Sequence, residues 1–158
     1  MTPAINAAKK AGIRYDILEY QHDPDAPSYG EEAANVLNLP PAQVFKTLLV
    51  SLSGHKSPLA VAVLPVSHQL SLKAIAKALG AKKADMADPK VAERTTGYIV
   101  GGISPIGQKK ALPTVIDQSA TAFTAIYCSA GRRGLEIGLA ANDLASLTRG
   151  IFAEITAQ

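Results

Sequence analysis

The 158-residue sequence has few of the residues on which several common architectures depend. It contains a single cysteine, Cys128, so no disulfide can form within the chain, and a reducing compartment suits it. Tryptophan is absent and aromatic residues make up only 5%, so the core must be built from Ala, Val, Leu and Ile. The composition therefore excludes a disulfide framework and argues against an aromatic platform for stacking RNA bases.

Long apolar stretches are also missing. Apolar runs such as residues 59–66 are far too short to span a bilayer, so we expect no membrane segment. The first residues lack the basic and apolar regions of a secretory signal, and we expect a cytoplasmic protein. Without internal repeats, linkers or low-complexity tracts, a chain of this length predicts a single domain over residues 1–158.

Charge is distributed unevenly along the chain, although the formal net charge is only +3. Residues 1–45 carry a net charge of −3, residues 46–133 one of +8, and residues 134–158 one of −2. The basic middle predicts a face of positive potential, which favours an anionic partner such as RNA. A solvated lysine-rich surface without such a partner explains the same pattern.

Helix and strand signals are mixed along the chain without a regular βαβ repeat. Thr2, Pro3 and Gly12 are typical of the beginning and end of a helix, which they predict between them. The other predicted helices and strands are helices at 30–37, 71–79, 88–97 and 142–147, and strands at 13–20, 44–52, 59–65, 112–117, 124–129, 134–139 and 151–155. The order predicts an α/β protein of the α+β type, with a mixed sheet, curled or partly closed, and helices outside it.

Lys46 is the residue most informative about chemistry. It lies in the predicted strand 44–52, on the face that it shares with Val44, Leu48 and Val50. An ammonium group in apolar surroundings is costly unless it meets water, an anion or hydrogen-bond acceptors. Two interpretations follow: a lysine that protects a sheet edge from aggregation, or a cation that faces a pocket and stabilises a phosphate or a developing oxyanion.

The segment 97–110 is rich in glycine, and its backbone can approach a ligand closely. Such a loop can direct several N–H groups at an anion, although an irregular turn is the simpler interpretation. Gly102 and Gly107 have the spacing of a phosphate-binding P-loop, but Gln108 stands where that motif requires lysine. A nucleotide triphosphatase is therefore not expected.

The usual catalytic groupings are poorly supported. No motif joins His22, His55 or His68 to a serine or to Cys128 as a nucleophile with its base. The spacing of His22 and the nearby aspartates matches no known class of metal site, so we expect neither a metal nor another cofactor. The turn at 128–134 carries two arginines, which suit either a phosphate backbone or a plain basic hairpin.

Three segments together resemble the YbaK/EbsC family of bacterial aminoacyl-tRNA deacylases. They are Phe-Lys-Thr-Leu-Leu-Val at 45–50, Lys-Lys-Ala-Asp-Met-Ala-Asp at 82–88, and the run from Thr96 through Gly-Gly-Ile-Ser-Pro-Ile-Gly-Gln-Lys-Lys at 101–110. The resemblance covers essentially the whole chain and is greatest to the members that act on Cys-tRNA(Pro). It implies a mixed, barrel-like sheet surrounded by helices.

The resemblance also implies a pocket and a reaction. Lys46 corresponds to the family lysine, and the substrate-binding residues would be Tyr20, Tyr29, Thr47, Gly101, Gly102, Ser129, Gly131 and Glu136. Members acting on Cys-tRNA are thought to use no protein nucleophile: the thiol of the substrate attacks its own ester and leaves as a thiolactone, a lyase-like step. Their choice of tRNA is thought to come from association with prolyl-tRNA synthetase.

The residues alone leave other functions open. The chain could act on another aminoacyl-tRNA, such as alanyl- or seryl-tRNA, or bind RNA through its basic middle without catalysis. An aminoacyl ester is already activated, so orientation and charge stabilisation can supply much of its deacylation rate without a triad. The family resemblance, which this chemistry fits, implies an aminoacyl-tRNA deacylase that acts on Cys-tRNA(Pro) and on Cys-tRNA(Cys) and takes part in translation quality control.

Overall fold

The computed structural model describes residues 1–25 and 29–157. Its helices are α1 (Pro3–Ala11), α2 (Tyr29–Val36), α3 (Leu72–Leu79), α4 (Pro89–Thr96), the 3₁₀ helix η1 (Gln118–Ala122) and α5 (Ala141–Thr148). Its strands are β1 (Tyr15–Glu19), β2 (Phe45–Ser53), β3 (Leu59–Pro65), β4 (Lys83–Met86), β5 (Thr114–Asp117), β6 (Ile126–Arg132), β7 (Leu135–Leu139) and β8 (Ile151–Ala153). None of the helices in these ranges is long and apolar enough to cross a bilayer.

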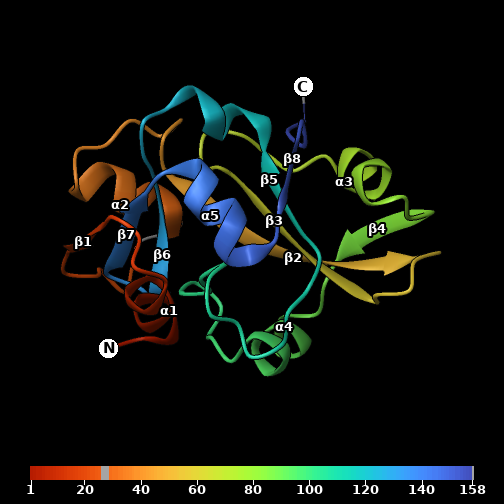
Figure 1. Cartoon of the computed structure of the whole chain (residues 1–158), viewed down its shortest axis with the longest axis horizontal. Coiled ribbons are helices and arrows are strands. Elements are labelled where there is room, and N and C mark those ends of the chain that lie inside the picture. The colour runs from red at the N-terminus through yellow and green to blue at the C-terminus, as the bar shows by residue number, and fades with distance from the viewer. Residues whose placement is uncertain (26–28, 158) are drawn as a thin grey trace.

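The strands form two sheets (Figure 1). One has the order β1-β7-β6 and is antiparallel throughout. The other has the order β4-β2-β3-β5-β8, with β4, β2 and β3 antiparallel and with β5 parallel to both β3 and β8. A parallel bridge between Val44 and Tyr127 joins the two sheets. The predicted α+β fold with a mixed sheet and helices packed outside is confirmed.

The two faces of the larger sheet are covered by different elements. Val50 and Leu52 of β2 pack with Ile75 of α3 in one apolar cluster. Phe45 and Leu49, on the opposite face of the same strand, belong to the main core, which also includes residues of α1, α4, α5, β6 and β7. The period-2 pattern of β2 thus separates two cores, because alternate side chains of a strand point to opposite faces.

Local signals account for most helix ends. The side chains of Thr2, Ser71 and Asp88 accept hydrogen bonds from backbone N–H groups in the first turns of α1, α3 and α4. Each of these three helices ends at a glycine in the left-handed region, where a residue without Cβ meets no steric penalty. These boundaries agree with the helices predicted from the sequence.

Three elements differ from the predictions. The 3₁₀ helix η1 lies between the predicted strands 112–117 and 124–129, where no helix was predicted. The short edge strand β4 was not predicted, because three of its four side chains are exposed and Ala84 alone is buried. Strand β6 does not end at Ser129 but continues to Arg132 through an irregularity in its pairing with β7. After this irregularity the backbone of Arg132 lies against the glycine-rich segment, where a Cβ on Gly102 would be 2.7 Å from Arg132 Cα.

Candidate functional site

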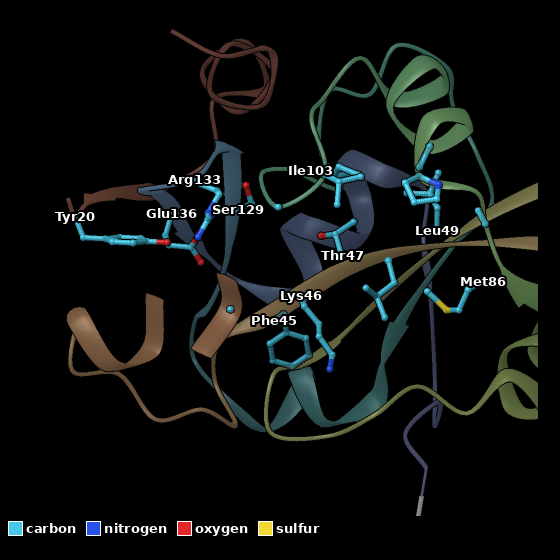
Figure 2. Close-up of a pocket in the computed structure, with 17 residues that line it drawn as sticks. Tyr20, Phe45, Lys46, Thr47, Leu49, Met86, Ile103, Ser129, Arg133 and Glu136 are labelled. Carbon is cyan, nitrogen blue, oxygen red and sulfur yellow. The ribbon is translucent and has the colours of Figure 1, made fainter. Parts of the chain in front are cut away.

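A cavity of about 400 Å³ lies beside β2, between the segment that follows α4 and the β6–β7 hairpin (Figure 2). Its volume is in the range of sites for small molecules. The side chains and backbone that line it are those of Tyr20, Gly30, Phe45, Lys46, Thr47, Leu48, Leu49, Met86, Ala87, Pro89, Ala92, Val100, Gly101, Ile103, Ser129, Arg133 and Glu136.

The cavity follows a part of β2 that pairs with a strand on one side only. Strand β4 pairs with β2 from Val50 onward, and β6 meets it only at Val44. Among the described residues, no strand covers that edge of β2 between these two points. A ligand in the cavity therefore lies against strand backbone that is available for hydrogen bonding.

Thr47 is in the middle of this open edge. Val44 and Leu52 direct their backbone groups toward the β3 side. Val66 N–H donates to Val44 C=O at 2.8 Å, and Leu52 N–H donates to Pro58 C=O at 2.8 Å. In an antiparallel pair the direction of these groups alternates, so the N–H and C=O of Thr47 face the cavity side. Its hydroxyl Oγ1 is buried and has no hydrogen-bond partner among the described residues. An orphaned buried hydroxyl beside two backbone groups is typical of a place that a polar ligand occupies.

Lys46 extends from the other face of β2. In Figure 2 its amine points away from Thr47, so the cavity borders both faces of the strand at its open edge. Burial lowers the pKa of Lys46, and the carboxylate of Glu31 on α2 partly offsets this effect. Gly30 permits this arrangement, because a Cβ on it would lie 2.3 Å from Val66 Cγ1. Leu48 and Val50 pack together in one cluster, as the predicted face requires.

The glycine-rich segment forms the wall opposite β2. Gly101 has a φ of +97° and lines the cavity, and Gly102 packs behind it against the β6–β7 hairpin. A Cβ on Gly102 would lie 2.7 Å from Arg132 Cα, so only glycine fits there. Ser104 is fully buried, and its hydroxyl accepts a hydrogen bond from Ile106 N–H at 3.2 Å. Packing and hydrogen bonds therefore hold most of the segment in place, and the backbone of Gly101 borders the cavity.

Polar side chains gather at one end of the cavity. Glu136 on β7 is opposite Ser129 on β6 in the sheet register. Figure 2 shows the hydroxyl of Tyr20 directed toward Glu136. Burial raises the pKa of Glu136 to about 8 and also raises the pKa of Tyr20. At neutral pH Glu136 and Tyr20 are therefore mostly uncharged, although one of them is a carboxyl.

A buried carboxylate holds Arg133 at the same end. Glu32 on α2 lies 3.6 Å from Arg133 Nη2 and 3.0 Å from His22 Nδ1, and it accepts a hydrogen bond from Asp23 N–H at 2.7 Å. These groups lower the pKa of Glu32 in spite of its burial, so it is an anion. Glu32 thus connects α2, the segment after β1 and the β6–β7 hairpin, and it fixes the guanidinium beside the cavity.

Most of the predicted site residues lie together. Those that line the cavity are Tyr20, Lys46, Thr47, Gly101, Ser129 and Glu136. Gly102 and Gly131 stand behind the wall: a Cβ on Gly131 would lie 2.9 Å from Thr2 Cβ and from Tyr98 Cε1. The side chain of Tyr29 lies outside the described part of the structure. Met86 and Val100 line the cavity without having been predicted, since no local pattern shows that their segments meet there. Arg133 also lines it and comes from the two-arginine turn that the sequence analysis considered.

Conventional nucleophiles are badly placed. Cys128 is fully buried in the main core, where burial raises the pKa of its thiol. Of the cavity residues that the structure describes, none is a histidine, and Ser129 Oγ accepts a hydrogen bond from Gly131 N–H at 3.1 Å. Within the same residues, no three potential metal ligands converge. The cavity can therefore orient and stabilise a ligand but has no Ser–His or Cys–His pair.

The sequence of residues 23–147 matches the family of aminoacyl-tRNA editing domains. The chain is 43% identical over 155 residues to the "Putative Cys-tRNA(Pro)/Cys-tRNA(Cys) deacylase EbsC" of Enterococcus faecalis, covering 98% of this chain and 93% of that protein. The chain therefore belongs to the aminoacyl-tRNA editing domain family.

Solved structures share the fold at low sequence identity. A "putative trans-editing enzyme for prolyl tRNA synthetase" superposes with a TM-score of 0.85 at 18% identity, over 99% of this chain and 96% of the other. The "hypothetical protein APE2540" superposes with a TM-score of 0.84 at 20% identity, over 98% and 99% of the two chains. At these identities the likeness concerns the fold.

Proposed function

We propose that this protein is an aminoacyl-tRNA deacylase that hydrolyses Cys-tRNA(Pro), and also Cys-tRNA(Cys), after their release from the synthetase. The observation that supports this proposal is the open edge of β2. On one face of the strand the Thr47 hydroxyl lacks a hydrogen-bond partner among the described residues, and on the other face Lys46 is half-buried. The 43% identity to a protein named as such a deacylase supports the choice of substrate.

The absence of a histidine among the described cavity residues favours a mechanism in which the substrate provides the nucleophile. The cysteine thiol of the substrate, with an ordinary pKa of about 8.5, is partly ionised near neutrality. The thiolate sulfur bonds to the ester carbonyl carbon, the bond from that carbon to the ribose oxygen breaks, and this oxygen takes up a proton from solvent. A cyclic thiolactone and the free tRNA leave, and water then opens the thiolactone.

Each cavity residue has a role in this reaction. The ammonium of Lys46 supplies positive charge to the thiolate or to the terminal ribose and phosphate of the tRNA. The hydroxyl and backbone of Thr47 orient the aminoacyl group, and Gly101 leaves room for the ester. Glu136, with a pKa of about 8, stays mostly neutral near pH 7, so it adds no negative charge that would oppose formation of the thiolate.

The proposal includes a partner and a compartment. A pocket that holds only the aminoacyl end reads little of the tRNA body, so selection of tRNA(Pro) would come from association with prolyl-tRNA synthetase. Such trans-editing takes place where translation does, in the cytoplasm. A pull-down with prolyl-tRNA synthetase and charged tRNA tests the association.

Deacylation of a panel of Cys-, Ala- and Ser-charged tRNAs tests the activity. Cys-tRNA should lose its amino acid fastest, and Lys46→Ala should lower kcat/KM about 100- to 1,000-fold, as loss of one transition-state contact does. Lys56→Ala, an exposed lysine in the β2–β3 turn, is the matched control. No release above the rate without enzyme refutes the function, and faster release of alanine or serine moves the specificity to that amino acid.

A further inference from the structure

Three exposed apolar side chains border the mouth of the cavity. Met86, at the end of β4, is 53% exposed, and Ile99 and Val100, in the turn after α4, are 76% and 39% exposed. Met86 and Val100 line the cavity itself, and Ile99 directly precedes Val100 in the chain. Exposed apolar groups beside a binding site are typical of a contact surface. We call these three residues the apolar ledge.

The turn that carries two of these residues is held in place by its own hydrogen bonds. Val100 N–H donates to Glu93 Oε2 on α4 at 2.8 Å, and Gly102 N–H donates to Ile99 C=O at 2.8 Å. Lys109 N–H donates to Thr96 C=O at 2.8 Å, which closes the segment onto the end of α4. The exposure of the apolar ledge is therefore built into the fold.

Exposed basic residues lie on α4 and on segments that contact the turn of Ile99 and Val100. Lys90 and Arg94 are exposed on α4, one helical turn apart. Lys109 and Arg132 are also exposed, and their backbones lie close to the turn: a Cβ on Gly97 would be 3.4 Å from Lys109 Cβ, and a Cβ on Gly102 would be 2.7 Å from Arg132 Cα. The surface thus combines apolar contact area with positive charge.

The nearby acidic groups are engaged within the protein. Asp88 caps α4 by accepting Lys90 N–H at 2.8 Å, Glu93 holds the turn, and Asp85 forms an ion pair with Lys83 at 3.7 Å. Across residues 1–25 and 29–157, the side chains of Lys90, Arg94, Lys109 and Arg132 form no ion pair. This charge pattern complements a polyanion.

The size of the cavity determines which part of an aminoacyl-tRNA lies outside it, against the apolar ledge. A cavity of about 400 Å³ holds an aminoacyl group with its ribose, but not a chain of nucleotides. The acceptor end of tRNA is single-stranded, so its preceding bases are unpaired and have to leave through the mouth. The apolar faces of unpaired bases gain by packing against apolar side chains, and the phosphates between them seek cations.

We propose that Met86, Ile99 and Val100 receive the bases of the last unpaired nucleotides of an aminoacyl-tRNA, while Lys90, Arg94, Lys109 and Arg132 neutralise the phosphates. This inference rests on the deacylase function proposed above. The ledge contacts the RNA end and not the amino acid, so it contributes to KM for tRNA and is indifferent to the identity of the aminoacyl group.

The test uses Ile99→Ser, whose side chain lies outside the cavity, with Ile151→Ser on β8 as control, since Ile151 is 46% exposed. With Cys-tRNA, Ile99→Ser should raise KM about five- to tenfold at nearly unchanged kcat, the range expected for a lost base contact. With cysteinyl-adenosine, which has no preceding nucleotides, this difference should disappear. Ile151→Ser should resemble the wild type in both assays.

A second arm measures binding without turnover. A short RNA hairpin with an unpaired CCA end should bind the wild type more tightly than Ile99→Ser, and removal of the CCA should abolish this difference. Lys109→Gln should reduce the slope of log affinity against log salt by about 0.7, the value for one contact to single-stranded phosphate. Equal affinities of the wild type and Ile99→Ser, or an equal rise of KM for cysteinyl-adenosine, overturn the inference. A wild type that deacylates neither substrate refutes the proposed function instead.

Discussion

Replacing Glu136 by glutamine should remove a pH dependence of folding stability that the burial of this carboxyl creates. Burial raises its pKa from 4.5 to about 8 in the folded protein. Glutamine has nearly the same size and cannot ionise, so Glu136→Gln keeps the packing and deletes the titration. Arg133, which also lines the cavity, forms an ion pair with Glu32 at 3.6 Å, and burial is the cause of the shift of Glu136.

The sign and size of the effect follow from the two pKa values. Below pH 4.5 the carboxyl is protonated in both the folded and the unfolded states, so it contributes nothing to the pH dependence. Between pH 4.5 and about pH 8 the unfolded chain releases the proton and the folded protein keeps it. Stability then falls by about 1.4 kcal/mol per pH unit, and about 3.5 units give a loss of about 5 kcal/mol.

Thermal unfolding measured from pH 4.5 to pH 8.5 checks this prediction. For a chain of this length about 5 kcal/mol corresponds to roughly 10–20 °C in Tm. Relative to the wild type, Glu136→Gln should gain that much in Tm between the two ends of the range. Glu19→Gln, an exposed carboxyl on β1, should follow the wild type. A constant difference between Glu136→Gln and the wild type at all pH values would refute the reasoning.

Two substitutions test the support of the cavity. Gly102→Ala should destabilise the protein by about 1–3 kcal/mol in urea unfolding, because its Cβ would lie 2.7 Å from the backbone of Arg132. The control is Gly12→Ala: a Cβ there would meet no atom of the described residues within 4 Å, so this variant reports the cost of positive φ alone. Glu32→Gln should cost about 2–4 kcal/mol, because it removes the buried negative charge that His22, Arg133 and Asp23 N–H contact; an unchanged midpoint would contradict that role.

The sequence by itself determined the features that depend on neighbouring residues. A cap such as Thr2, a stop such as Gly12 and the alternation along β2 act within a few residues, so helices and strands were predicted at nearly their observed places. The motifs at 45–50 and 96–110 pointed to the editing family for the same reason, since each is contiguous. Lys46, Thr47 and Gly101, three of the six predicted site residues that line the cavity, lie in these two motifs.

The tertiary structure alone decided where the cavity opens and which groups are charged in it. Strand β4 pairs with β2 only from Val50 onward, and β6 forms a bridge only with Val44, directly before β2. No local pattern reveals that the edge around Thr47 stays uncovered. The neutral Glu136 follows from its burial, and the anionic Glu32 depends on partners 10 and 101 positions along the chain, His22 and Arg133. Pairing of strands and burial of charge join distant segments, so their outcome exists only in the folded chain.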